Sequence, residues 1–344
     1  MAPPSDEGTT ARPPVMADVA KLAGVSHQTV SRVLNDHPNV RAHTREKVLA
    51  AIRELAYRPN AAARTLVTRR THTLGVISVD TMLYGPTSML YGFERAAHDV
   101  YFVSIASLPA LDRRSMLEAV DRFVGQGVEG IIVIATHDSG VAALAHVPPE
   151  VPIVALGCGT HASISSVAVD NEAGAKTATR YLLGLGHRTV HHIAGPAANL
   201  DAQERVGGWR LALREASAPE PPVLAGDWSA ASGYELARQL ASGADQPTAI
   251  LCGNDTMALG ALRALSERGL RVPADVSVVG FDDIPDASYY MPPLTTVRQD
   301  FGEVGREALS VLLERMAGES ATRLRVRVGT ELVTRQSAGP PPVR

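Results

Sequence analysis

Short apolar runs alternate with longer helical stretches from Leu74 onward, and this alternation limits the fold more than any other feature of the chain. Apolar runs separated by helices are typical of strands that are buried on both faces in a parallel α/β sheet. The runs expected to be strands are 74–79, 102–106, 130–135, 152–156, 189–194, 249–252 and 276–281. The helical stretches between them are 89–100, 113–126, 172–184, 205–215, 233–240 and 255–267. Two successive sets of strands predict two α/β lobes within residues 71–335.

Polar side chains that follow these strands indicate a ligand site. In open α/β sheets, ligands bind beyond the carboxyl ends of the strands, so a cleft between the two lobes is the expected site. Asn254 and Asp282 each come just after a predicted strand, and Arg205 is expected to open a helix. Such side chains can fix hydroxyl groups, and Trp228 offers an aromatic ring for the apolar face of a sugar.

Structural roles also explain some of these residues. Asp255 stands where a helix is expected to begin, a position that favours a carboxylate for electrostatic reasons alone. Asp283 can simply cap a turn, and Trp228 can simply pack between the lobes. Asp282 and Asp283 are not expected to form a catalytic pair, because adjacent residues of a strand point to opposite sides. No nucleophile–base arrangement is evident, so we predict a binding protein and not an enzyme.

The stretch from Met16 to Asn35 predicts a helix-turn-helix. Gly24 is expected to end the first helix in a left-handed cap, and the Ser26 side chain can cap the second helix. Apolar residues spaced three and four apart are expected to face inward. These residues are Val19, Ala20, Leu22 and Ala23 in the first helix, and Val30, Val33 and Leu34 in the second.

The polar face of the second helix suits recognition of base edges in a major groove. Its exposed residues are expected to be His27, Gln28, Thr29, Ser31, Arg32 and Asn35. Glutamine can bond adenine at two atoms, and arginine can do so with guanine. The charge agrees, because residues 12–70 hold eleven Lys and Arg against four Asp and Glu, a net +7, in a chain of net charge −3. A basic head on an acidic body indicates that the head contacts a polyanion.

A third helix and a basic connector follow. The helix is expected to begin with Thr44 as its cap and to end near Tyr57, because Pro59 disfavours helix at the residue before it. Its buried stripe is expected to be Val48, Leu49, Ile52 and Leu55. The alanine-rich segment 60–70 is too short to be stable alone, so it is expected to order only against DNA or a second copy. Leu66 can insert between base steps of the minor groove, or it can pack on the neighbouring domain.

Residues 16–66 resemble the DNA-binding head and hinge of the LacI/GalR family of transcriptional regulators. The shared motifs are the run from Asp18 to Asn35, the segment T-R-E-K-V that begins at Thr44, and the segment Y-R-P-N that begins at Tyr57. The resemblance continues over the core to about residue 335 and is densest over 226–230, 254–260, 269–283 and 292–301. It implies an all-α helix-turn-helix head joined to an α/β, two-lobed, periplasmic-binding-protein-like core with parallel sheets.

The family resemblance assigns expected roles to individual residues. It implies that His27, Gln28 and Arg32 read bases and that Leu66 is a minor-groove lever. The full set expected to contact DNA is Met16, Ser26, His27, Gln28, Thr29, Ser31, Arg32, Asn35, Asn60, Ala63 and Leu66.

The same resemblance implies an effector site. Arg205, Asn254 and Asp282 match positions that bond sugar hydroxyls. Met89, Trp228 and Phe301 match apolar walls of the pocket, and Gln299 matches a polar contact near the crossover between the lobes. Gly157 stands where galactoside-responsive members have an aspartate, which leaves the identity of the sugar open.

These features together predict a transcriptional repressor that a small sugar, a galactoside or a related glycoside, releases from double-stranded operator DNA. Two heads related by a two-fold axis would need two half-sites, so a homodimer on a palindromic operator is expected. A ligand that tightens DNA binding, as a corepressor, is the alternative. The core alone would also fit a sugar-binding transport protein, but the basic head argues against that class.

The remaining composition excludes other classes. Residues 1–14 lack the apolar stretch of a secretory signal, and no apolar run reaches the roughly 20 residues that span a bilayer, so a cytoplasmic, nucleoid-associated protein is expected. Cys158 and Cys252 lie in apolar runs and are expected to be buried free thiols. No Cys/His cluster has zinc spacing, and no cofactor is expected.

We predict a disordered lead over 1–14, a helix-turn-helix domain over 15–59, a hinge over 60–70, the two-lobed core over 71–335 and a disordered tail over 336–344. No apolar heptad follows Arg335, so the tetramer-forming helix of some family members is not expected.

Overall fold

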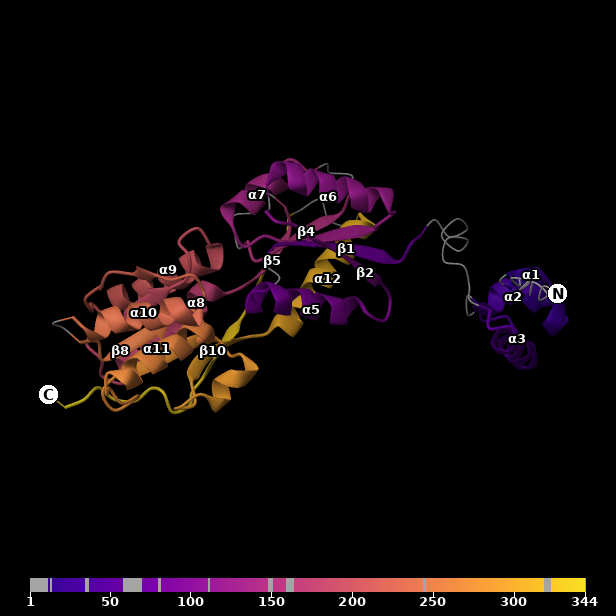
Figure 1. Ribbon diagram of the computed structural model, residues 1–344. Helices are drawn as coiled ribbons and strands as arrows, with labels where there is room; N and C mark the ends of the chain where they lie inside the picture. The colour runs from indigo at the N-terminus through magenta and orange to yellow at the C-terminus, as the bar shows by residue number, and fades with distance from the viewer. Residues whose placement is uncertain are drawn as a thin grey trace, which may run out of the picture. The chain divides into compact units, whose positions relative to one another are not determined.

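The computed structural model describes residues 12, 14–34, 37–57, 70–79, 82–110, 112–147, 151–158, 164–243, 246–318 and 323–343 (Figure 1). The chain divides into two compact units, Met1–Thr71 and His72–Arg344. This division falls one residue from the predicted boundary between the hinge and the core. Within the described part of the chain, no helix has both the length and the apolar character needed to cross a membrane.

The first unit contains the predicted helix-turn-helix. Its helices are α1 (Met16–Ala23), α2 (His27–Leu34) and α3 (Ala42–Glu54). Gly24 ends α1 with a left-handed φ of 65°, and the backbone N–H of Thr29 donates to Ser26 Oγ at 3.1 Å, so both predicted caps are confirmed. The small core between the helices consists of Val19, Ala20, Val30, Val33, Val48, Ala51 and Tyr57.

Three expectations about this unit are wrong. Leu22 and Leu49 are 46% and 40% exposed, because the buried stripes run through Val19 in α1 and Val48 in α3, and each leucine lies off its stripe. Thr44 is not the cap of α3, because the helix begins two residues earlier, at Ala42.

The first lobe of the core is a six-stranded parallel sheet in the order β11-β5-β4-β3-β1-β2. Its strands are β1 (Thr73–Ser78), β2 (Phe102–Ser107), β3 (Gly130–Ile134), β4 (Ile153–Leu156), β5 (Ser166–Val169) and β11 (Arg325–Val328). Helices α5 (Tyr84–Ala97) and α12 (Phe301–Ala317) cover one face, and α6 (Arg113–Gly125) and α7 (Asp138–Leu144) cover the other. The edge strand β2 is not buried on both faces as expected, since Phe102 and Ile105 are 71% and 52% exposed.

The second lobe repeats this architecture with the strand order β12-β10-β9-β8-β6-β7. Its strands are β6 (His191–Ala194), β7 (Leu224–Ala225), β8 (Ala249–Cys252), β9 (Ser277–Asp282), β10 (Thr295–Gln299) and β12 (Thr330–Val333). Helices α8 (Asn171–Gly184) and α9 (Leu200–Glu215) pack on one face, and α10 (Ala230–Ala241) and α11 (Asp255–Glu267) pack on the other. All described pairs are parallel except β10 with β12. A short 3-10 helix, η1 (Pro285–Tyr289), follows β9.

The chain passes between the lobes three times. The passages lie between β5 and α8, between β10 and α12, and between β11 and β12. The returning helix α12 therefore belongs to the first lobe, although its residues follow those of the second lobe in sequence.

Residues after Arg335 are ordered in part, against the expectation of a disordered tail. Ser337 is fully buried and donates through Oγ to the Val278 carbonyl at 2.6 Å. The Gly339 carbonyl accepts from Ser277 Oγ at 2.9 Å and lies 2.9 Å from His187 Nε2. These contacts run to Ser277 and Val278 at the start of β9 and to the His187 ring, and hydrogen bonds of this kind leave no apolar period in the sequence.

Both cysteines are free and fully buried, as predicted. Burial raises the pKa of the Cys158 thiol to about 12 and also raises the pKa of the Cys252 thiol.

Gly260 allows α11 to approach α10 closely, and its replacement by alanine is expected to destabilise the second lobe. A Cβ atom at Gly260 would overlap the carbonyl oxygen of Ala230, a backbone atom that cannot rotate away. We expect the free energy of unfolding to fall by about 1–3 kcal/mol, since overpacking of this size outweighs the gain in helix propensity. Urea denaturation of the full-length protein measures this change.

Gly184→Ala is the matched control, because a Cβ atom at Gly184, the last residue of α8, meets nothing within 4 Å. This control is expected to be neutral or slightly stabilising. Equal stability of the two variants would show that α10 and α11 can separate at little cost.

Candidate ligand cleft and nucleic-acid interface

A cavity lies between the lobes at the carboxyl ends of several strands. It encloses about 400 Å³ of space, part of which is open to solvent. The first lobe contributes Leu83, Tyr84, Gly85, Pro86 and Thr136 to its lining, and the second lobe contributes Asn199, Asp201, Arg205, Trp228, Asn254 and Asp282. This is the position at which open α/β sheets bind ligands.

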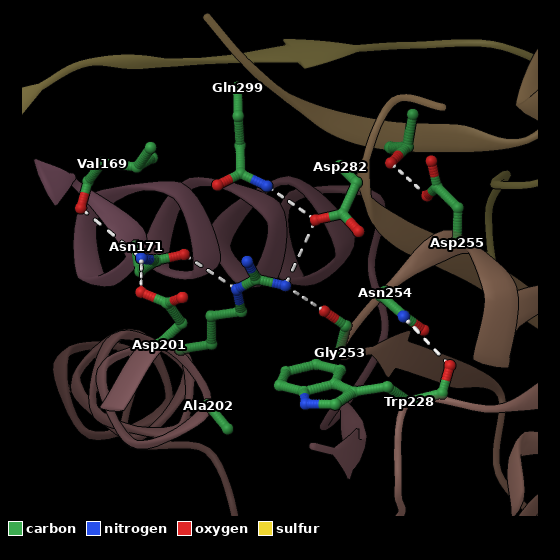
Figure 2. A network of polar contacts seen from close by, with 12 residues as sticks. Val169, Asn171, Asp201, Ala202, Trp228, Gly253, Asn254, Asp255, Asp282 and Gln299 are labelled. Atoms are coloured by element: carbon green, nitrogen blue, oxygen red, sulfur yellow. Dashed lines mark hydrogen bonds and ion pairs between the residues drawn. The ribbon is translucent and has the colours of Figure 1, made fainter. Parts of the chain in front are cut away.

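Arg205 is the centre of a polar network behind this cavity. Its Nε donates to Asn171 Oδ1 at 2.8 Å, and its Nη1 donates to the Gly253 carbonyl. Nη1 also lies 3.5 Å from Asp282 Oδ1, and the two side chains are only 6% and 8% exposed. Figure 2 shows Asn171, Gly253 and Asp282 converging on this network from different elements. The ion pair is therefore buried, and each partner depends on the other for compensation of its charge.

The guanidinium group of Arg205 is also held by aromatic rings. Its carbon lies 3.9 Å from the centre of the Phe281 ring and 5.5 Å from that of Trp228. Trp228 has a left-handed φ of 72°, which is uncommon for a bulky residue, and its carbonyl accepts from Asn254 Nδ2 at 3.1 Å. Asn254 thus fixes the turn that presents the indole ring. Strained backbone of this kind is often found at ligand sites.

Burial perturbs the two carboxyl groups of the cavity. The pKa of Asp282 is raised to about 7 by burial, although the positive charge of Arg205 opposes the shift. The pKa of Asp201 is raised to about 6 for the same reason, again against the charge of Arg205. One guanidinium group thus faces two carboxyl groups.

The structure brings together four of the seven residues that were predicted for the ligand site. Arg205, Trp228, Asn254 and Asp282 line the cavity. Gln299 lies behind Asp282 and donates to its Oδ1 at 2.6 Å (Figure 2).

Met89 and Phe301 do not line the cavity and instead belong to the core of the first lobe, where they are 2% and 8% exposed. The Tyr84 ring, which does line the cavity, packs edge-on against Phe301 at 5.9 Å. Tyr84 therefore forms the wall that Phe301 was expected to form.

Gly157 adopts a left-handed backbone with a φ of 76°. A Cβ atom there would lie 3.0 Å from Thr136 Cγ2, so both the backbone and the space disfavour a side chain.

Residues that the sequence interpretation missed complete the cavity. Asn199 and Asp201 were missed because α9 begins at Leu200, five residues before the expected start at Arg205. The signal was present, since the Asn199 side chain caps α9 by accepting from the N–H of Ala202 at 3.0 Å. Thr136 directly follows the predicted strand 130–135. It could therefore have been found as Asn254 was, by its position just after a strand.

The other acidic residues have structural roles, and that of Asp255 is the predicted one, whereas Asp283 forms ion pairs and not the expected turn cap. Asp255 begins α11, is fully buried, and accepts from the Ile284 N–H at 2.9 Å and from Thr296 Oγ1 at 2.5 Å. Asp283 pairs with Arg298 at 2.7 Å and Arg335 at 2.6 Å, on a different side from Asp282. Among the described residues, no group of three or more His, Cys, Asp or Glu side chains is arranged to hold a metal ion.

The second predicted surface is the outer face of α2. Ser26, His27, Gln28 and Arg32 are exposed there. Thr29, Ser31 and, on α1, Met16 are partly buried. Asn35, Asn60, Ala63 and Leu66 lie outside the residues that the structure describes.

Family comparisons match both units. Residues 15–60 match the bacterial regulatory proteins of the lacI family, and residues 179–338 match the periplasmic binding protein-like domain. The lactose operon repressor of Escherichia coli strain K12 is 37% identical over 314 residues, which cover 90% of this chain and 86% of that protein. The HTH-type transcriptional repressor PurR of Haemophilus influenzae is 33% identical over 328 residues, which cover 93% of this chain and 97% of that protein.

Solved structures agree with these matches. The Lac repressor dimer bound to operator and the anti-inducer ONPF superposes with a TM-score of 0.84 at 35% identity, covering 95% of this chain and 100% of that one. The complex of the transcriptional regulator CelR with cellobiose superposes with a TM-score of 0.70 at 33% identity, covering 94% of this chain and 99% of that one.

Proposed function

Since this chain belongs to the LacI family of bacterial transcriptional regulators, we propose that it represses transcription by binding operator DNA through α2 and releases the DNA when a small sugar occupies the cleft. The chain is a ligand-responsive DNA-binding repressor, as its relatives are. The observation that carries the proposal of a sugar is the grouping of Arg205, Asn254 and Asp282 around the Trp228 ring.

The chemistry of the cleft suits a glycoside. Carboxylate and amide groups can accept and donate hydrogen bonds to several hydroxyls at once, and an aromatic ring can pack against the apolar face of a pyranose. The CelR structure holds cellobiose in a related fold. A galactoside or related glycoside is our proposal for this chain, and the left-handed Gly157 favours one that needs no carboxylate at that position.

Recognition of DNA is assigned to the exposed face of α2. His27, Gln28 and Arg32 are proposed to contact base edges in the major groove. The surrounding contacts with DNA are proposed to come from Ser26, Thr29, Ser31, Asn35 and Met16. Asn60, Ala63 and Leu66 extend the proposal to the hinge, where Leu66 would insert into the minor groove.

A homodimer is proposed as the DNA-binding form. Large apolar side chains are exposed on both lobes, notably Phe102 at 71%, Tyr289 at 84% and Met291 at 91%. We propose that these side chains become covered when two copies of the chain associate. The related Lac repressor binds its operator as a dimer, and a two-fold axis matches two half-sites of a palindrome.

In this proposal, sugar binding and DNA binding are coupled because both depend on how the two lobes are arranged relative to each other. A sugar that prefers one arrangement of the lobes weakens DNA binding, and DNA must then weaken sugar binding by the same factor, typically about 5–150-fold. The opposite polarity, with a corepressor, would use the same cleft. A repressor of this kind acts on the chromosome in the cytoplasm, and no catalytic turnover is proposed.

Titration of the operator complex tests the proposal. The purified protein is bound to a labelled palindrome from upstream of its own gene and is titrated with galactosides, glucosides and purines at fixed salt. Release by one sugar class is the expected result, whereas tighter binding would show a corepressor. Absence of operator-specific binding, or hydrolysis of chromogenic glycosides by the protein, would contradict the proposal.

A further inference from the structure

Helix α9 belongs to the second lobe but is bonded to the first lobe as well. The backbone N–H of Leu200, its first residue, donates to the carbonyl of Thr136 at 2.9 Å, and Thr136 follows β3 of the first lobe. His137 and Asn199 form an antiparallel bridge beside this bond. The start of α9 is therefore a point at which non-covalent contacts hold the two lobes together.

An ion pair joins the same helix to the first lobe one turn further on. Arg327 of β11 donates to both oxygens of Glu204, through Nη2 at 2.7 Å and through Nη1 at 2.8 Å. Two parallel hydrogen bonds of this kind fix the geometry of both side chains and are stronger than a single charged contact. The glutamate side chain is 14% exposed and the arginine side chain 32%. This interlobe pair is therefore shielded in part from water and counterions, unlike most surface pairs.

Arg327 also contacts the passages of the chain between the lobes. It lies two residues before Gly329, the residue that connects β11 to β12. Its Nη1 also donates to the Val169 carbonyl at 3.3 Å, and Val169 ends β5 just before the chain enters α8. One guanidinium group thus connects two passages to α9. Rotation of one lobe against the other is therefore expected to pull Glu204 away from Arg327.

Other ion pairs of α9 lie within the second lobe. Arg205 pairs there with Asp282, and Glu215 pairs with Lys176 and Arg180. These pairs do not depend on the angle between the lobes, whereas the interlobe pair does. Neither member of the interlobe pair lines the cavity, so an effect on a ligand would act through the arrangement of the lobes.

We propose that the interlobe pair of Glu204 and Arg327 is a brace that holds the two lobes in the arrangement in which both line the cavity, and that it thereby strengthens binding of the effector. A ligand that contacts both lobes binds this arrangement best, so a contact that favours the arrangement raises the affinity. The link to the effector rests on the proposed function, whereas the brace itself does not. Because the pair is ionic and partly exposed, salt is expected to weaken it.

Hydrogen exchange of the full-length protein without ligand tests the brace. The Leu200 N–H is protected by its bond to the first lobe, so the exchange of a peptide from the start of α9, measured by mass spectrometry, reports separation of the lobes. In E204Q and R327Q this peptide is expected to exchange about 3–10-fold faster, the effect of a partly shielded ion pair. The double variant E204R/R327E restores the pair with its charges reversed and is expected to recover most of the protection.

The reversed pair separates a brace from a local effect on the helix. An arginine near the positive N-terminal end of α9 does not favour the helix, so the recovered protection cannot come from the helix itself. E215Q is the matched control, because it removes an ion pair of the same helix within the second lobe. Its exchange is expected to equal that of the wild type. R327Q and the reversed pair supply the test if E204Q unfolds in the urea titration that accompanies the series.

Calorimetric titration without DNA tests the link to the effector. The probes are methyl galactosides, methyl glucosides and cellobiose. In E204Q and R327Q, the sugar that binds the wild type best is expected to bind about 3–10-fold more weakly, with the order of preference among the sugars unchanged. Salt at about 1 M is expected to weaken sugar binding by the wild type by a similar factor and to leave that of E204Q unchanged.

The outcomes distinguish the brace from the proposed function. If E204Q and R327Q exchange like the wild type, or if the reversed pair does not recover protection, the brace is wrong. If exchange rises while sugar affinity is unchanged or increases, the link to the effector is wrong and the proposed function stands. If no sugar binds the wild type, the proposed function is wrong and the link to the effector with it, while hydrogen exchange still decides the brace.

Discussion

Replacement of Arg205 by alanine is expected to lower the free energy of unfolding by about 3–5 kcal/mol and to abolish the response to sugar. Arg205 and Asp282 are 6% and 8% exposed, so removal of the cation leaves a carboxylate buried without its partner. The variant also loses the donors to Asn171 and Gly253. Urea denaturation measures the stability, and release of labelled operator measures the response.

Arg210→Ala is the control for this experiment. Arg210 belongs to the same helix, but its pair with Glu220 is largely exposed, and such pairs contribute about 0–1 kcal/mol. A double variant, Arg205→Met with Asp282→Asn, removes both charges and is expected to recover much of the stability without the sugar response. If Arg205→Ala unfolded at the same urea concentration as Arg210→Ala, the network would not stabilise the core.

Replacement of both Gln28 and Arg32 by alanine is expected to remove operator-specific binding. Each two-point contact with a base contributes about 1–3 kcal/mol of discrimination, so loss of both is expected to cost about 2–6 kcal/mol on the operator. Both side chains are exposed on α2, so the stability of the head is expected to change by less than about 0.5 kcal/mol. Competition between operator and random DNA at fixed salt measures the change.

Arg53→Ala on α3 serves as the control, because it removes the same single charge from an exposed site outside α2. This control is expected to weaken binding to operator and random DNA by similar factors, as loss of a phosphate contact does. Should the double variant also weaken both DNAs equally, α2 would not be the base-reading element.

The fold was predictable where burial makes the sequence apolar. Strands β8 and β9 lie in the middle of their sheet, and their positions were predicted to within one residue. Strand β10 was missed because Thr295, Thr296 and Gln299 are buried polar residues, whose partners only the folded sheet supplies. The assignment of α12 to the first lobe was also not predictable, because the local sequence of a helix does not indicate which of two sheets it packs against.

The ligand site was predictable to a similar degree. Arg205, Asn254 and Asp282 were identified because they match family positions and, for the last two, because they follow strands. Asp201 was missed because the helix was expected to begin at Arg205. Met89 and Phe301 were expected in the cavity wall from the family resemblance alone, and the lining instead contains Tyr84, whose ring packs edge-on against Phe301.

The burial of Cys158 and Cys252 has a practical consequence for the study of lobe motion. A thiol reacts with alkylating reagents as the thiolate, and both thiols are shielded from solvent with raised pKa values. The wild-type sequence is therefore already a suitable background for site-specific fluorescent labelling. A single cysteine placed on the exposed face of α6 and another on that of α10 would carry a donor and an acceptor dye, and energy transfer between them would report lobe closure as sugar is added.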